Sequence, residues 1–138
     1  AEKGRLAEAV EAMQRAAAIE PPDASTIFNC AFLLQRAARH EDALASFTHA
    51  TTLEPFLDRA WYGAGLSLAA LGRHAEAAER FVEAGRLQPF NPYAGYQAAA
   101  AWFKLAEHEK VQAEYQRVKG FDPKVADQMR RDFGLSER

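Results

Sequence analysis

The sequence predicts an all-α protein, a superhelical stack of antiparallel helix hairpins. Prolines stand 34 residues apart along the 138-residue chain, at Pro21, Pro55, Pro89 and Pro123. The residue eight positions before each proline is large, namely Met13, Phe47, Phe81 or Tyr115. The residue five positions before it is smaller, namely Ala16, Ala50, Ala84 or Val118. A helical pattern that repeats with such a period is typical of an α-solenoid, in which neighbouring units bury one another's apolar faces.

The composition narrows the class of partner. The chain has 17 basic and 19 acidic side chains and a net charge of −2, so nothing draws it generally to nucleic acid or to anionic membranes. No apolar run is long enough for membrane insertion. The first residues contain neither an initiator Met nor a signal-peptide core, and we expect a mature or excised segment. A single cysteine cannot form an internal disulfide, so the fold does not depend on an oxidising compartment. Localisation stays open, with the cytoplasm slightly favoured.

The first unit, residues 1–23, is expected to be a half-repeat. Gly4-Arg5 is predicted to be a turn and residues 6–20 the second helix of a hairpin whose first helix is absent. Two explanations are open. Either the segment comes from a longer array, or the lone helix caps the stack through Ala9, Met13 and Ala16. Excision is favoured because a cap is expected to have a polar outer face.

Residues 24–57, 58–91 and 92–122 are predicted to be full repeats. In the first of them, apolar residues recur with helical spacing on both sides of a break at residues 37–40. The equivalent break one period later contains Gly72, which can take the left-handed conformation that ends a helix. Each proline disfavours helix in the residue before it and so ends the second helix. Every repeat is therefore predicted to be a helix hairpin.

Residues 123–134 are predicted to form a capping helix. Asp122 and Pro123 suit the N-cap and the first turn, and Gly134 can end the helix. Val125, Met129 and Phe133 lie four residues apart, so they form an apolar stripe that should cover the last hairpin. The polar side chains are expected to face water; they are Lys124, Asp127, Gln128, Arg130 and Arg131.

The repeat resembles the tetratricopeptide repeat. The resemblance rests on Trp61, Ala64-Gly65, Leu68, Leu71-Gly72, Ala77, Phe81, Ala84 and Pro89, and the preceding unit repeats most of it. The last hairpin departs from the pattern. It has Gly95 in place of the first-helix aromatic, Ala106 in place of the turn glycine, and Val111 and Val118 in place of alanines. Its packing is therefore expected to be shifted.

No residue pattern predicts catalysis, a metal or a cofactor, and we expect the chain not to be an enzyme. His40, His74 and His108 lie one period apart, which separates them by about 10 Å, whereas metal ligands must converge at about 2 Å. They are interpreted as rings that pack on the turns. Cys30 occupies a small-residue position inside a helix and is interpreted as a buried apolar residue.

The resemblance implies a concave groove lined by the first helix of each hairpin. The groove residues carried over by position are Phe28, Asn29, Phe32, Arg36, Arg59, Tyr62, Leu66, Tyr93, Tyr96, Gln97, Phe103 and Lys104. Six are aromatic, more than solubility requires, although some rings could instead fold inward between hairpins. The set contains basic residues and no acidic one. It predicts a protein or peptide partner with apolar anchors and an acidic residue or carboxylate.

Other roles stay open within the same family. One branch of the family binds the C-terminal carboxylate of chaperone tails, and this chain resembles it poorly. Asn29 and Arg59 occupy the positions of an asparagine and a lysine of that branch, but Gly63 replaces its arginine. The small tetratricopeptide chaperones of bacterial secretion systems resemble this chain in length and topology. The alternatives to groove binding are a scaffold or homo-oligomer joined through the chain ends and a regulatory domain of a fused enzyme.

Overall fold

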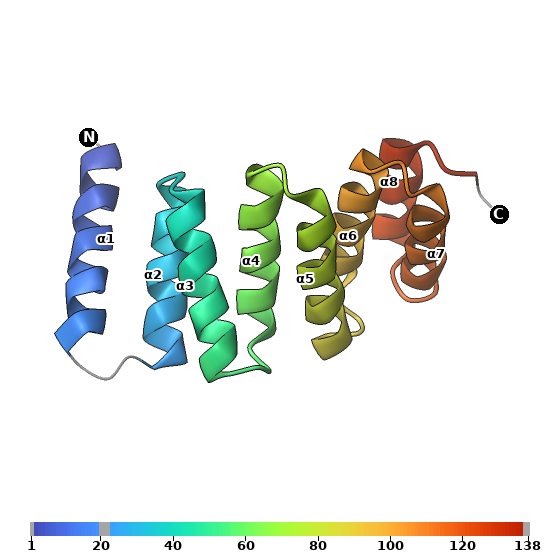
Figure 1. The fold of residues 1–138 in the computed structure, drawn as a ribbon. Coiled ribbons are helices and arrows are strands. Elements are labelled where there is room, and N and C mark those ends of the chain that lie inside the picture. The colour runs from blue at the N-terminus through green and yellow to red at the C-terminus, as the bar shows by residue number, and fades with distance from the viewer. Residues whose placement is uncertain (1, 20–22, 137–138) are drawn as a thin grey trace.

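The chain folds entirely into helices over the residues that the computed structural model describes, 2–19 and 23–136 (Figure 1). The eight helices in this part are α1 (Glu2–Ile19), α2 (Ala24–Arg36), α3 (His40–Leu53), α4 (Asp58–Ala70), α5 (His74–Leu87), α6 (Pro92–Lys104), α7 (His108–Lys119) and α8 (Pro123–Phe133). The prediction of an all-α fold is confirmed. No helix in the described residues is both long enough and apolar enough to span a membrane.

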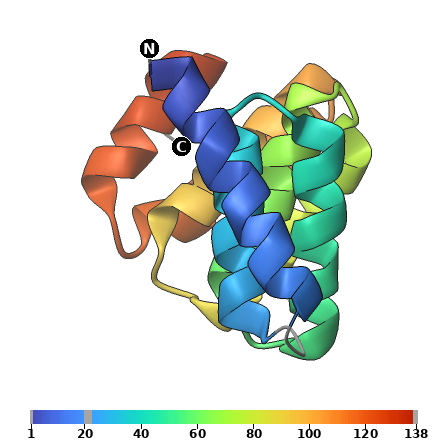
Figure 2. The ribbon, with the colours of Figure 1, turned by 90° about the vertical axis from the view of Figure 1, so that its left-hand side faces the viewer.

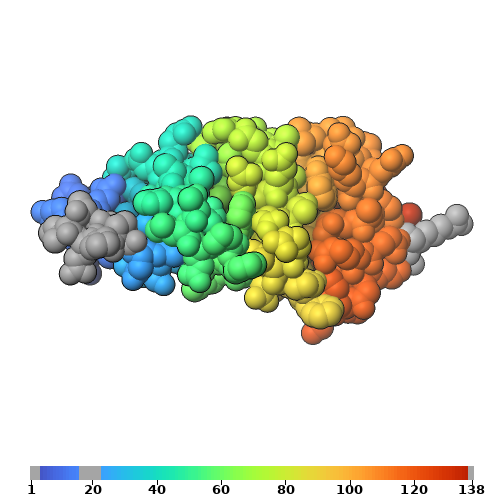
Figure 3. All heavy atoms as spheres, turned by 60° about the horizontal axis from the view of Figure 1, so that its bottom comes forward, coloured from blue at the N-terminus to red at the C-terminus, as the bar shows by residue number. Residues whose placement is uncertain are grey.

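The helices follow one another along a single axis as hairpins. The helices α2 and α3, α4 and α5, and α6 and α7 pair within hairpins, and α3 packs on α4 and α5 on α6 between them. Figure 1 shows this order, and in Figure 3 the segments succeed one another along the length of the molecule. The end-on view shows that the later helices are swung away from the earlier ones (Figure 2). The predicted superhelical stack is therefore confirmed.

Each hairpin encloses one large ring from its second helix. Phe47 and Phe81 are only 1% exposed and pack beside alanines that are equally buried. A Cβ atom added to Gly65 would lie 2.6 Å from Cε1 of Phe81. Since real Cβ contacts are longer, the absence of a side chain at this position is what allows the helix to approach the ring.

The turns inside the three hairpins share one backbone geometry. Ala38, Gly72 and Ala106 have φ values of 60°, 77° and 58°, which is the left-handed region. After each of them, the next amide donates to the carbonyl five residues earlier, as from Arg39 to the carbonyl of Leu34 at 2.9 Å. This is the Schellman motif that ends a helix. Two of the three turns thus place alanine where the conformation favours glycine.

The last hairpin is adapted to its unusual residues. A Cβ atom on Gly95 would lie 2.8 Å from both Cγ2 of Val118 and Nη2 of Arg117. Arg117 in turn donates to the carbonyl of Pro89 at 3.2 Å. Glycine at this position therefore makes room for a larger residue of α7, which is the physical reason that the two departures from the repeat pattern occur together.

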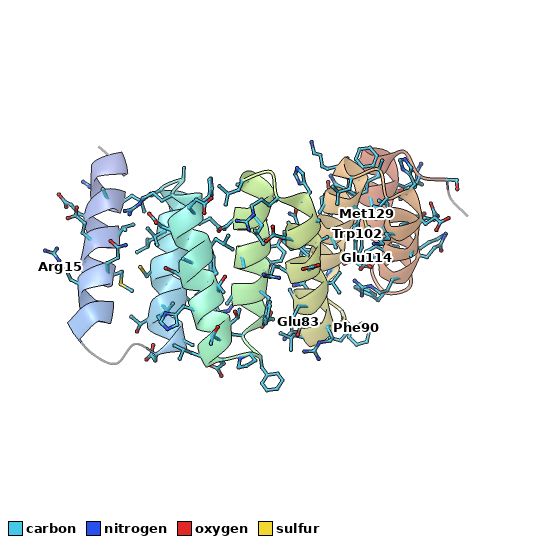
Figure 4. All side chains as sticks on the ribbon, in the orientation of Figure 1. Arg15, Glu83, Phe90, Trp102, Glu114 and Met129 are labelled. Atoms are coloured by element: carbon cyan, nitrogen blue, oxygen red, sulfur yellow. The ribbon has the colours of Figure 1, made fainter. Side chains whose placement is uncertain are left out.

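The first helix differs from its prediction. The expected turn at Gly4-Arg5 is wrong, because α1 runs without a break from Glu2. Strong helix formers surround Gly4, and one glycine costs a helix only about 1 kcal/mol. Val10 is fully buried and Met13 packs on the first hairpin, while Arg15 points away from α2 (Figure 4). Glu20 and Pro21 lie outside the described residues.

The capping helix α8 runs from Pro123 to Phe133, and its stripe of Val125, Met129 and Phe133 packs into the core of the last hairpin. Asp122 accepts a hydrogen bond from the amide of Val125 at 3.1 Å, and Gly134 ends the helix with a φ of 63°. Met129 is fully buried in the cluster that joins α6, α7 and α8, against which Trp102 packs; both are labelled in Figure 4.

Candidate binding groove

A groove of about 360 Å³ lies across the first helices of the hairpins. Half of the predicted groove residues line it together: Phe28, Phe32, Arg59, Tyr62, Leu66 and Tyr93. They come from α2, α4 and the first turn of α6. The positions carried over from the family resemblance therefore converge at the N-terminal two thirds of the stack.

The floor of the groove is aromatic and rests on the core. The ring of Phe28 meets the ring of Phe47 edge to face, with centroids 5.8 Å apart and planes at 60°. One repeat later, Tyr62 meets Phe81 in the same way at 5.4 Å and 65°. Such edge-to-face pairs are a favoured arrangement of aromatic rings. Phe28 and Tyr62 are half-buried: each ring packs against the core and also lines the groove.

The rim of the groove is more exposed. Phe32 is 46% exposed and Tyr93 is 60% exposed, which is unusual for large rings that have no partner to cover them. The guanidinium of Arg36 lies 6.0 Å from the centroid of the Phe32 ring. Arg36 itself extends from the end of α2 beside the groove rather than lining it.

The groove holds one cation over its aromatic floor. The guanidinium of Arg59 lies 4.9 Å from the centroid of the Phe28 ring, a cation–π contact. No carboxylate of the described residues forms an ion pair with Arg59. Asp58 also lines the groove, so the expectation of a surface without acidic residues is wrong for this pocket. Asp58 belongs to the first turn of α4, where the helix dipole stabilises a carboxylate.

Gln35 links the two helices at the centre of the groove. Its side-chain amide donates to the carbonyl of Gly63 and to Oγ of Ser67, both at 3.1 Å. Ser67 is fully buried, and this bond supplies its hydroxyl with a partner. The amide therefore helps to fix α2 against α4.

Position in the first helices did not reveal every lining residue. The lining also includes Phe47, Asp58, Ala84 and Asn91. Phe47 reaches the groove because Gly63 has no side chain, and a Cβ atom there would lie 2.5 Å from the ring. Asn91 is the N-cap of α6, where its side chain accepts from the amide of Tyr93 at 2.9 Å. In the sequence, Gly63 was the signal that could have revealed Phe47, and the N-cap position of Asn91 was the signal that could have revealed Asn91 itself.

The other predicted residues lie outside this pocket. Asn29, Gln97 and Lys104 do not line it, and Tyr96 and Phe103 lie where α8 packs on α6. The ring of Phe133 is 5.3 Å from both of their rings, centroid to centroid. The hydroxyl of Tyr96 donates to Oδ2 of Asp132. This hydrogen bond, together with burial and the nearby negative charge, raises the pKa of Tyr96 to about 12.

The described residues provide no group of three His, Cys, Asp or Glu side chains that could hold a metal ion. His40, His74 and His108 are the first residues of α3, α5 and α7 and stand at three separate turns. Cys30 is buried, and burial raises the pKa of its thiol, which favours the unreactive protonated form.

The fold recurs in solved structures of modest sequence identity. The crystal structure of MamA matches with a TM-score of 0.83 at 18% identity, over 97% of this chain and 82% of that one. The first TPR of Spaghetti (RPAP3), bound to the HSP90 peptide SRMEEVD, matches with a TM-score of 0.74 at 18% identity, over 81% of this chain and 90% of that one.

YrrB, described as a TPR protein with an unusual peptide-binding site, matches with a TM-score of 0.75 at 27% identity. The match covers 91% of this chain and 64% of YrrB. No protein-family model matches the sequence, and no curated protein matches it. The structural matches and the 34-residue motif together show that this chain has the tetratricopeptide-repeat fold.

Proposed function

We propose that the chain is a non-catalytic interaction module that binds a segment of a partner protein in the groove between α2, α4 and the start of α6. The observation that carries the proposal is the groove itself, an open concavity of about 360 Å³ with an aromatic floor and exposed rings at its rim. Exposed aromatic surface of this kind is typical of binding sites, because rings bury large areas at a small cost in side-chain entropy.

The cation in the groove supports an acidic group on the partner. Arg59 is held over an aromatic ring and has no carboxylate partner in the described residues, so a partner carboxylate would gain a charge-assisted hydrogen bond there. The same reasoning fits the RPAP3 match, whose bound peptide has the acidic sequence SRMEEVD. Asp58 on the same groove would disfavour a partner with several carboxylates close together.

A double substitution of Tyr62 and Tyr93 by alanine tests the proposal. Partners are first captured with the whole chain and identified by mass spectrometry, and their affinities for the variant are then measured by titration calorimetry. We expect a loss of more than about tenfold, since truncation of central aromatic anchors usually costs more than the 1.4 kcal/mol that a factor of ten represents. Helical circular dichroism should be unchanged.

Phe56 provides the matched control. It is 76% exposed and does not line the groove, so Phe56→Ala removes an exposed ring elsewhere on the surface. Affinity should survive this change. Full affinity of the Tyr62/Tyr93 variant for every captured partner would refute groove binding and would favour an interaction through the chain ends or the outer helices.

A further inference from the structure

The last helix, α8, packs on two aromatic rings of α6, the first helix of the last hairpin. Phe133 of α8 contacts the rings of Tyr96 and Phe103 of α6, with 5.3 Å between centroids in each pair. The residue before it, Asp132, accepts the hydrogen bond of the Tyr96 hydroxyl and a second one from Nε2 of Gln128 at 3.3 Å. An acidic residue followed directly by an aromatic one thus satisfies both the ring and the hydroxyl of Tyr96.

The groove repeats the same tyrosine one period earlier. Tyr62 lies 34 residues before Tyr96, and both belong to first helices. Phe81 packs against the ring of Tyr62 from the core side. No described residue is hydrogen-bonded to the Tyr62 hydroxyl, and the residue lines the open groove. Tyr62 therefore offers a partner the two features that α8 uses on Tyr96.

The spacing of the groove residues suits a helix. Phe28 and Phe32 lie four residues apart on α2, and Tyr62 and Leu66 lie four apart on α4. Residues four apart form the ridges of a helix surface, and ridges of one helix pack into the grooves between the ridges of another. An amphipathic helix with apolar residues at the same spacing would fill the space between the two rows.

We propose that the groove takes a helix of a partner protein whose inward face carries an acidic residue directly followed by an aromatic one, in the manner of Asp132 and Phe133. This inference rests on the proposed function and specifies the partner of the same site. The aromatic side chain packs against Tyr62 and Phe28, and the carboxylate accepts from the Tyr62 hydroxyl. Arg59 lies on the same groove, and its charge is complementary to that carboxylate.

The probe is a synthetic peptide with the sequence of residues 122–136, which contains all of α8, added to the whole chain and followed by fluorescence anisotropy. The matched peptide carries alanine in place of Asp132 and Phe133. We expect the first peptide to bind and the second to bind at least about tenfold more weakly. Failure of the first peptide to bind at up to about 1 mM would overturn the proposal.

Substitutions in the chain locate the peptide. Tyr62→Phe removes only the hydroxyl, so it should weaken the peptide by about fivefold and reduce the further effect of Asp132→Ala in the peptide to the part that the charge of Arg59 contributes. Tyr96→Phe should leave this coupling intact. Coupling to Tyr96 instead would mean that the peptide displaces α8 at its own site, which would overturn the proposal.

The two proposals can fail separately. If the peptide does not bind but the Tyr62/Tyr93 variant loses its natural partner, groove binding stands and the helical acidic–aromatic partner is wrong. If neither the peptide nor any captured partner depends on Tyr62, both proposals are wrong.

Discussion

Replacing the alanines at two hairpin turns by glycine should make the protein more stable. Ala38 and Ala106 have φ values near 60°, whereas the equivalent turn contains Gly72 at 77°. All three residues are exposed at the surface, and in each turn the amide of this residue donates to the carbonyl three residues earlier and the next amide to the carbonyl five residues earlier. The expected change therefore comes from the backbone, because hardly any side-chain packing is lost with the methyl group.

The magnitude follows from two opposing effects. An L-residue other than glycine pays about 1–2 kcal/mol in the left-handed region. Glycine gives back about 0.4–1 kcal/mol because its unfolded chain has more freedom to lose. The net gain is about 0.5–1 kcal/mol for each of Ala38→Gly and Ala106→Gly. The two turns share no partners, so the double variant should gain about 1–2 kcal/mol.

The assay is urea unfolding followed by circular dichroism, with tryptophan fluorescence as a second probe. Gly72→Ala is the matched reverse change, since a Cβ atom there would meet nothing within 4 Å, and it should lose about 0.5–1 kcal/mol for the same backbone reason. A lower unfolding midpoint for both glycine variants, with no loss in Gly72→Ala, would show that backbone strain does not govern these turns.

Three further outcomes can be measured in the same protein. Gly65→Ala should cost about 1–3 kcal/mol in unfolding free energy, because the new methyl would overlap a fully buried ring. Gly4→Ala is its control: the new methyl meets nothing within 4 Å, and alanine should stabilise the helix by up to about 1 kcal/mol. Gln35→Ala should cost about 1–2 kcal/mol by leaving the buried Ser67 hydroxyl unpaired, and the loss should shrink when Ser67 is also alanine. Tyr96 should ionise near pH 12 in an ultraviolet titration of the folded protein. Because its pKa is raised above the ordinary value of 10, its contribution to stability is complete below pH 10 and is lost between pH 10 and 12, a loss that Tyr96→Phe should remove.

The fold could be predicted because the same alternation of large and small residues recurs in successive repeats. Large rings at Phe47 and Phe81 and alanines at fixed offsets define the inside of each hairpin, and the structure buries them as expected. The turn at Gly4-Arg5 was predicted by analogy with the other units. It is wrong because α1 continues through Gly4 without a break, since the residues on both sides of this glycine favour helix.

The candidate site could be predicted only in part. Counting positions along the first helices identified Phe28, Tyr62 and Tyr93, because their place in a repeat fixes the face they occupy. The same count could not reveal that α8 packs on Tyr96, since that contact depends on the angle at which the last helix lies. Nor could it reveal Asp58, whose place at the start of α4 is set by the preceding loop.

The ring of Phe47 belongs both to the core and to the floor of the groove. It is only 1% exposed, yet it lines the pocket through the space that Gly63 leaves open. A partner that rests on this ring would be in contact with the part of the hairpin that unfolds with the core. Binding would then raise the melting temperature by mass action, and a substitution that deepens the groove by shortening Phe47 would also leave a cavity in the first hairpin. Ligand selectivity and thermal stability are thus coupled through a single side chain.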